Sequence, residues 1–154
     1  MFRIMFYQPE IPGNTGNVIR LAANTGCELH LVEPLGFSMD SAHVRRAGLD
    51  YHDLAVVCVH PDLATAWRVL LPANVYAFTN GGTRQYTDVA YVPRDVLLFG
   101  SESAGLPRQV LDATEVTARL RLPMMPASRS LNLANTTAIA VYEAWRQNNF
   151  GESA

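Results

Sequence analysis

Short apolar runs alternate with helix-forming segments along most of this chain, and the alternation limits the folds available to it. Strands are predicted at residues 2–7, 28–32, 55–59, 75–79, 96–99 and 119–122. Several of these runs are apolar throughout, which is typical of strands in a parallel sheet that helices cover on both faces. The sequence therefore predicts one α/β domain over residues 1–154, with a mostly parallel sheet flanked by helices and a frayed tail at 151–154.

The segments between the strands predict helices and one long loop. Residues 17–25 have a helical pattern that Gly26 can end, and Asp62 is a good N-cap for a helix that reaches residue 70. Residues 8–16 contain two prolines and two glycines, which predict a loop. Further helices are predicted at residues 41–47, just after Pro107, and from an N-cap at Ser130 through the apolar helical pattern that ends near Trp145.

The composition indicates a soluble globular protein that stays in the cytoplasm. Hydrophobic residues make up 49% of the chain and charged residues 17%. No apolar run approaches the roughly 20 residues needed to span a bilayer, so no membrane partner is expected. Cys27 and Cys58 are isolated and form no disulfide framework, as expected in a reducing compartment. The four histidines lack metal-ligand spacing, so no metal is expected.

The charge pattern allows nucleic-acid binding only through a local basic patch. The net charge is -2, so no global basic field attracts RNA. All 12 basic residues are arginine, which suits phosphate contacts, although a biased genome composition would produce the same pattern. Arginines gather at Arg45 and Arg46 and again at Arg119, Arg121 and Arg129. These two groups are the candidate basic patches.

Three loops that follow predicted strands are candidates for one binding site. They cover residues 78–82, 99–105 and 122–130, and the last contains Pro123 and Pro126 on either side of two methionines. Loops at the carboxyl ends of neighbouring parallel strands meet at one edge of a sheet, where α/β proteins bind ligands. Glycines there allow close approach of the backbone, and Met and Leu offer an apolar slot. The pattern favours a nucleoside pocket, although each loop alone could be a tight turn.

Other common sites match less well. Gly100 and Gly105 have the spacing of a P-loop, but Leu106 follows where the phosphate-binding lysine belongs. No G-x-G-x-x-G follows a strand, which argues against a dinucleotide fold. A hydrolase elbow at Ser101–Gly105 would need a later histidine, yet the last one is His60.

One side of the first predicted helix is polar. Asn17, Arg20 and Asn24 are spaced by three and four residues and therefore share a face. This face suits contact with ribose, phosphate or a second subunit, and a solvated surface is the alternative.

Four segments carry a family resemblance that covers nearly the whole chain. They are residues 9–26 (PEIPGNTGNVIRLAANTG), 45–52 (RRAGLDYH), 97–107 (LLFGSESAGLP) and 121–147 (RLPMMPASRSLNLANTTAIAVYEAWRQ). In these segments the chain resembles the SPOUT class of RNA methyltransferases, and most closely the TrmL (YibK-like) family of tRNA 2′-O-methyltransferases. The resemblance implies a deep trefoil knot in the C-terminal part, a homodimer, and S-adenosylmethionine as cofactor, with S-adenosylhomocysteine as product. The implied substrate is the ribose of a cytidine or uridine at the wobble position of leucine tRNAs.

The resemblance also implies roles for individual residues. The cofactor site would contain Phe78, Thr79, Gly100, Gly105, Leu122, Met124, Ser130 and Leu131. The catalytic positions would be Arg20, Glu102, Ser130 and Asn132, with Arg20 completing the site of the other subunit. Contacts to tRNA are expected from Asn14, Asn17, Arg20, Arg45, Arg46 and Arg129. Two alternatives stay open: a non-catalytic dimer that binds RNA or a nucleotide, and the same chemistry on a different RNA.

Overall fold

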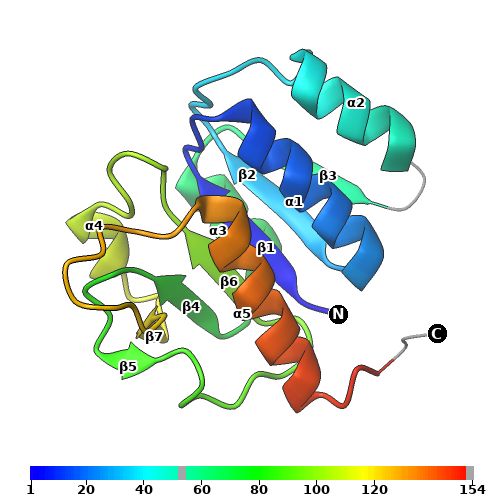
Figure 1. Cartoon of the computed structure of the whole chain (residues 1–154). Helices are drawn as coiled ribbons and strands as arrows, with labels where there is room; N and C mark the ends of the chain where they lie inside the picture. Colours follow the sequence, from blue (N-terminus) through cyan, green and yellow to red (C-terminus); the bar gives the residue numbers. More distant parts are fainter. Residues whose placement is uncertain (52–54, 152–154) are drawn as a thin grey trace.

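Seven parallel strands form one sheet in the computed structural model, which describes residues 1–51 and 55–151 (Figure 1). The strands are β1 (Arg3–Tyr7), β2 (Glu28–Val32), β3 (Val56–His60), β4 (Val75–Phe78), β5 (Arg84–Gln85), β6 (Val96–Phe99) and β7 (Ala118–Arg121). Their order across the sheet is β3-β2-β1-β6-β4-β7-β5. Every one of these neighbouring pairs runs parallel, which confirms the predicted sheet.

Helices cover both faces of the sheet. The helices are α1 (Pro12–Thr25), α2 (Ala42–Tyr51), α3 (Leu63–Leu70), α4 (Arg108–Leu111) and α5 (Leu133–Gln147). The apolar side chains of α1, α2 and α5 pack in one core cluster, and those of α3 and α4 pack in a second. Figure 1 shows α1 and α5 side by side in front of the sheet.

Burial on both faces explains why the sequences of the central strands are apolar without alternation. In β1, Ile4 and Phe6 belong to the core under α1 and α5, whereas Met5 belongs to the core under α3. All three side chains are fully buried. Because both faces of the strand are covered, polar residues at either set of positions would be buried without partners.

The first helix begins earlier than predicted. α1 starts at Pro12, so the expected loop over residues 8–16 is wrong in its second half, and the expected start at Asn17 is five residues too late. Proline suits the first turn because the N–H that it lacks has no helical partner there. The two glycines near this helix start led to the prediction of a loop from the local sequence.

The last helix also begins at a different residue. Its N-cap is Asn132 and not Ser130, because the Asn132 Oδ1 atom accepts hydrogen bonds from the N–H groups of Ala134 (2.9 Å) and Asn135 (3.2 Å). By contrast, the predicted cap of α3 is confirmed: Asp62 accepts from the Thr65 N–H at 2.7 Å. Sequence analysis missed β5, which has only two residues and no apolar run.

Strand β7 lies between β4 and β5, although β5 follows β4 directly along the chain. The turn that joins β4 to β5 therefore crosses the end of β7. A Cβ atom on Gly82 in this turn would lie 2.4 Å from the Leu120 carbonyl carbon, so only glycine allows the crossing. A threaded C-terminal part would produce this strand order; the trefoil knot itself stays a prediction.

Two of the sequence-based expectations concern residues that lie partly outside the described part of the chain. Of the predicted tail at 151–154, only Gly151 lies in the described part, and His52 of the RRAGLDYH segment lies outside it. Within residues 1–51 and 55–151, no helix is long and apolar enough to cross a membrane.

Candidate active site

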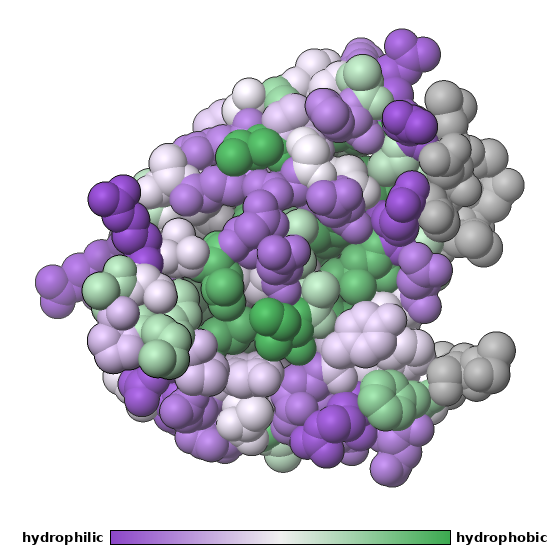
Figure 2. All heavy atoms as spheres, in the orientation of Figure 1, coloured by the Kyte–Doolittle hydropathy of each residue, from purple (hydrophilic) through white to green (hydrophobic). Residues whose placement is uncertain are grey.

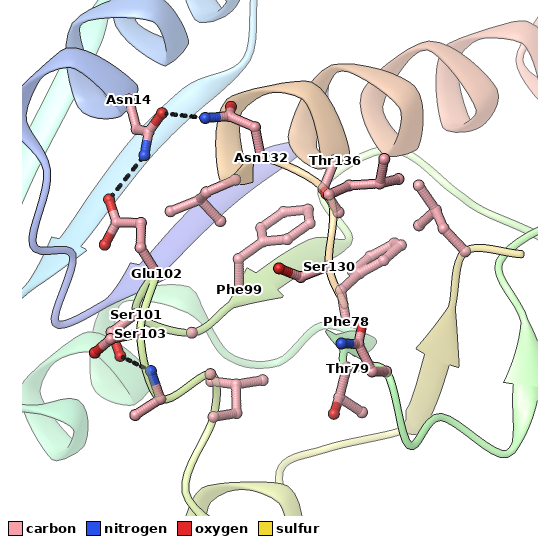
Figure 3. A pocket seen from close by; sticks show the side chains of 18 of the residues that line it. Asn14, Phe78, Thr79, Phe99, Ser101, Glu102, Ser103, Ser130, Asn132 and Thr136 are labelled. Atoms are coloured by element: carbon pink, nitrogen blue, oxygen red, sulfur yellow. Dashed lines mark hydrogen bonds between the residues drawn. The ribbon is translucent and has the colours of Figure 1, made fainter. Parts of the chain in front are cut away.

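A cavity of about 550 Å³ opens at the carboxyl ends of β4, β6 and β7, next to the start of α5 (Figure 3). All three loops that were predicted to meet at one sheet edge line it. The volume lies within the usual range for a small-molecule site, about 300–1,000 Å³. The sequence-based expectation of one pocket built from these loops is therefore confirmed.

The floor of the pocket is apolar. The rings of Phe78 and Phe99 come from neighbouring positions on β4 and β6 and stack with centroids 4.7 Å apart and planes 18° apart. Both are nearly buried, at 7% and 2% exposure. Leu120 and Leu122 at the end of β7 extend this surface. A flat organic ring can bury its face here without leaving polar protein groups unpaired.

The loop after β6 folds back on itself along one wall. A Cβ atom on Gly100 would lie 2.1 Å from the Gly105 carbonyl carbon, and the Gly105 N–H donates to the Ser101 carbonyl at 2.9 Å. Gly105 adopts a left-handed conformation with φ of 67°. The glycine spacing therefore serves the closure of this loop.

Glu102 holds the start of α1. Its Oε2 atom accepts from the Glu10 N–H at 2.7 Å, and its Oε1 atom accepts from the Ile11 N–H at 3.0 Å and from Asn14 Nδ2 at 3.1 Å. No side chain of α1 caps its own helix, because Ile11 stands at the N-cap position. The carboxylate anchors the backbone that enters α1 and places a negative charge near the helix N-terminus, where it is favourable.

Two asparagines extend this contact to α5. Asn14 is 5% exposed, and its Oδ1 atom accepts from Asn132 Nδ2 at 2.9 Å, as Figure 3 shows. Asn132 uses its other amide atom to cap α5. Glu102, Asn14 and Asn132 are therefore engaged with one another and with backbone, which is the geometry of positioning residues. Direct roles in catalysis or tRNA contact stay predictions for all three.

Ser130 and Arg129 are more available to a ligand. Ser130 is exposed, and Figure 3 shows its hydroxyl directed into the pocket. Arg129 lines the pocket and is exposed, and its carbonyl accepts from Asn80 Nδ2 at 3.0 Å. Asn80 fixes the loop after β4 against the loop before α5.

Sequence reasoning missed several lining residues outside the motif positions. They are Ile11, Leu133 and Thr136. A helical repeat would have found Thr136, because it lies one turn after Asn132 on α5. Nothing local marked Ile11, since its place depends on where α1 begins.

The predicted Arg20 lies elsewhere on the surface. Asn17, Arg20 and Asn24 line a second groove of about 510 Å³ between α1 and α5, whose other wall includes Tyr142. Figure 2 shows hydrophobic side chains in a hollow on this face. Arg20 does not line the pocket of its own chain.

The remaining predicted arginines, Arg45 and Arg46, are exposed on α2 and also stay outside the pocket lining. Within the described residues, no group of three His, Cys, Asp or Glu side chains could hold a metal ion.

Comparison with known proteins places this geometry in a family. The model of the SpoU rRNA methylase family matches residues 1–142. This chain belongs to the SpoU methylase family. A relative from an Acidovorax species, named tRNA (cytidine(34)-2′-O)-methyltransferase, is 55% identical over 152 residues, which cover 97% of this chain and 94% of the relative. A relative of the same name from Escherichia coli is 48% identical over 147 residues, covering 96% and 94%.

Solved structures of SpoU-family proteins share the fold. One that concerns 2-OH methylation of C/U34 on tRNA is 42% identical, with a TM-score of 0.91 and 97% of each chain covered. The SpoU methyltransferase AviRb from Streptomyces viridochromogenes, in complex with AdoMet, is 27% identical, with a TM-score of 0.79, covering 97% of this chain and 61% of that one. The family therefore supports the α/β fold and methyltransferase chemistry.

Proposed function

We propose that this SpoU-family chain transfers a methyl group from S-adenosylmethionine to the 2′-hydroxyl of nucleotide 34 in tRNA, as the names of its relatives state for them. The nucleotide is a cytidine or uridine, and leucine tRNAs are the expected substrates. The observation that carries the proposal is that all eight residues expected around the cofactor line one cavity. Activity on tRNA would place the protein in the cytoplasm, as its cysteine content suggested.

The cavity has the properties that this cofactor requires. Its volume of about 550 Å³ accommodates a nucleoside with an amino-acid arm. The apolar floor of Phe78 and Phe99 suits a base, and the exposed backbone of the loops that contain Thr79, Gly100 and Leu131 offers hydrogen bonds. When bound, the cofactor supplies a methyl group that is already activated by a sulfonium.

The protein's main contribution is orientation. Holding two reactants in line can supply on the order of 7–11 kcal/mol of the barrier. Ser130, directed into the pocket, is placed to hold the ribose. Glu102 is a poor candidate for a general base, because each of its oxygens already accepts a hydrogen bond from α1 or from the two residues just before it. We assign the proton to water, and we assign Arg20 to phosphate binding and to stabilising developing alkoxide charge, since guanidinium stays protonated.

A homodimer would bring Arg20 to the reaction. α5 exposes Ile139 at 39% and Tyr142 at 47%, and Tyr142 lines the groove beside the polar face of α1. Packing of two copies over this groove would bury these side chains and direct Arg20 of one copy toward the pocket of the other.

The first experiment incubates the protein with total tRNA and methyl-labelled cofactor and maps the product by mass spectrometry. The expected product is 2′-O-methylcytidine or 2′-O-methyluridine at position 34 of leucine tRNAs, the position named for the relatives. No methylated product in total tRNA, or a product at another position, would reject the assignment. Calorimetry with S-adenosylhomocysteine tests the non-catalytic alternative, which predicts no binding.

A second experiment tests the shared site by mixing two inactive chains, Arg20→Ala and Leu122→Arg. If Arg20 acts across the dimer, each mixed dimer contains one intact site, and random mixing restores about a quarter of wild-type activity. Failure to restore activity, with mixed dimers verified by mass, would place Arg20 in the site of its own chain.

A further inference from the structure

Ile11 occupies a position for which its side chain is badly suited. It is the N-cap of α1, where Ser, Thr, Asp and Asn are preferred and isoleucine is among the poorest residues. Its own side chain makes no capping bond, and its N–H donates to Glu102 instead. Glu102 holds the backbone at the entry to α1, so the Ile11 side chain is not what fixes the start of the helix. An apolar residue here calls for another explanation.

The side chain of Ile11 lies at the rim of the pocket. It lines the cavity and is 49% exposed, whereas Phe78 and Phe99 on the floor are almost buried. Leu131 is the only other aliphatic lining residue among the described residues with large exposure, at 43%. The cavity therefore has an apolar rim in addition to its apolar floor.

The polar groups around this rim are already committed. Asn14, Glu102 and Asn132 line the α1 side of the pocket and bond to one another and to helix N-termini. Each of them already makes hydrogen bonds that hold the starts of α1 and α5, so bonding to the edge of a base would compete with these contacts. A ligand on this side is accordingly recognised by shape and apolar contact.

We propose that Ile11 packs against the face of the target nucleobase, with Leu131 as a second contact. The inference rests on the proposed function, because the ribose that receives the methyl group must lie at the pocket mouth, and its base is one bond away. The apolar face of a base has no donor or acceptor pattern, so aliphatic packing accepts either pyrimidine. This matches the C/U34 substrate named for the relative of known structure.

The test replaces Ile11 with threonine, measured on leucine tRNA transcripts with cytidine or uridine at the wobble position. Threonine keeps the β-branch and is a better N-cap, so α1 should not lose stability. Removing the aliphatic contact should raise the KM for both transcripts about tenfold and leave the affinity for S-adenosylhomocysteine unchanged. Ile11→Leu should stay near the wild-type KM. Met125→Thr is the matched control, because Met125 is 78% exposed but does not line the pocket.

Three results would overturn the inference. The first is an unchanged KM for tRNA in Ile11→Thr. The second is a loss of S-adenosylhomocysteine affinity that accounts for the loss of activity. The third is dissociation into monomers in sedimentation, which would make Ile11 a subunit contact. Failure of the wild-type protein to methylate either transcript is a different outcome, because it rejects the proposed function itself.

Discussion

Replacing Glu102 with glutamine separates a positioning role from a role as a general base. The carboxylate accepts three hydrogen bonds, from the N–H groups of Glu10 and Ile11 and from the Asn14 amide. A glutamine keeps one oxygen, so its NH₂ must face at least one of these donors. At least one charge-assisted bond is lost, and such bonds contribute about 1.5–3 kcal/mol each.

Because Glu102 is only half-buried, we expect a loss near the lower end, about 2 kcal/mol. For a chain of this length, such a loss lowers the Tm by about 4–8 °C. Glu33→Gln is the matched control, since Glu33 is exposed and should change stability by less than about 0.5 kcal/mol. Thermal unfolding without ligand gives the stability, and single-turnover methylation across pH gives the chemistry.

A positioning role predicts that Glu102→Gln loses stability and rate together while the shape of the pH–rate profile is kept. A general base predicts that one limb of the profile disappears, whatever the change in Tm. An unchanged Tm would refute the reasoning, because it would mean that the three short contacts to α1 contribute nothing.

Three further predictions follow from contacts elsewhere in the chain. Gly100→Ala should destabilise the protein by about 1–3 kcal/mol and abolish cofactor binding, whereas Gly81→Ala, whose Cβ meets nothing within 4 Å, should do neither in unfolding and calorimetry experiments. Asn132→Ala should cost about 1–2 kcal/mol in urea unfolding through loss of the α5 cap, and Asn132→Ser should recover most of it. Burial lowers the pKa of His30 and of its stacked partner His60. The unfolded chain therefore binds more protons, and stability should fall as pH decreases through about 6.5; a flat urea midpoint from pH 8 to 5 would contradict this.

The strands were predictable because both faces of the sheet are covered. Burial on both sides favours continuous apolar runs, which are present in β1 from Ile4 to Phe6, in β4 and in β6. The meeting of the three loops was predictable for a related reason, since carboxyl ends of parallel strands share an edge. The order of the strands was not predictable, because periodicity does not tell which strand lies beside which. For example, β1 pairs with β6 and places Arg3 beside Val96, more than ninety positions further along the chain.

The two helix starts that sequence analysis missed have different causes. At α5 both Ser130 and Asn132 are good N-caps, and local sequence could not choose between them; the Asn132 amide is also needed by Asn14. At α1 the group that holds the entry to the helix is Glu102, 91 residues from Ile11, so no local window contains it. Interpretation of local sequence fails where a site is held together by contacts between distant segments.

The same contacts suggest why α1 matters to both sites of a dimer. Its N-terminus is fixed by Glu102 to the wall of its own pocket, and Arg20 lies nine positions after Ile11, about 13 Å along the helix. If Arg20 acts in the partner's site, a shift of α1 at the wall of its own pocket also moves Arg20. The change at one site then alters the reaction in the other subunit. Glu102→Gln should then lower the rate at both sites of a mixed dimer that contains one altered chain. If only one of the two sites slows, α1 bends or Arg20 acts within its own chain, and the shared geometry proposed for the dimer fails.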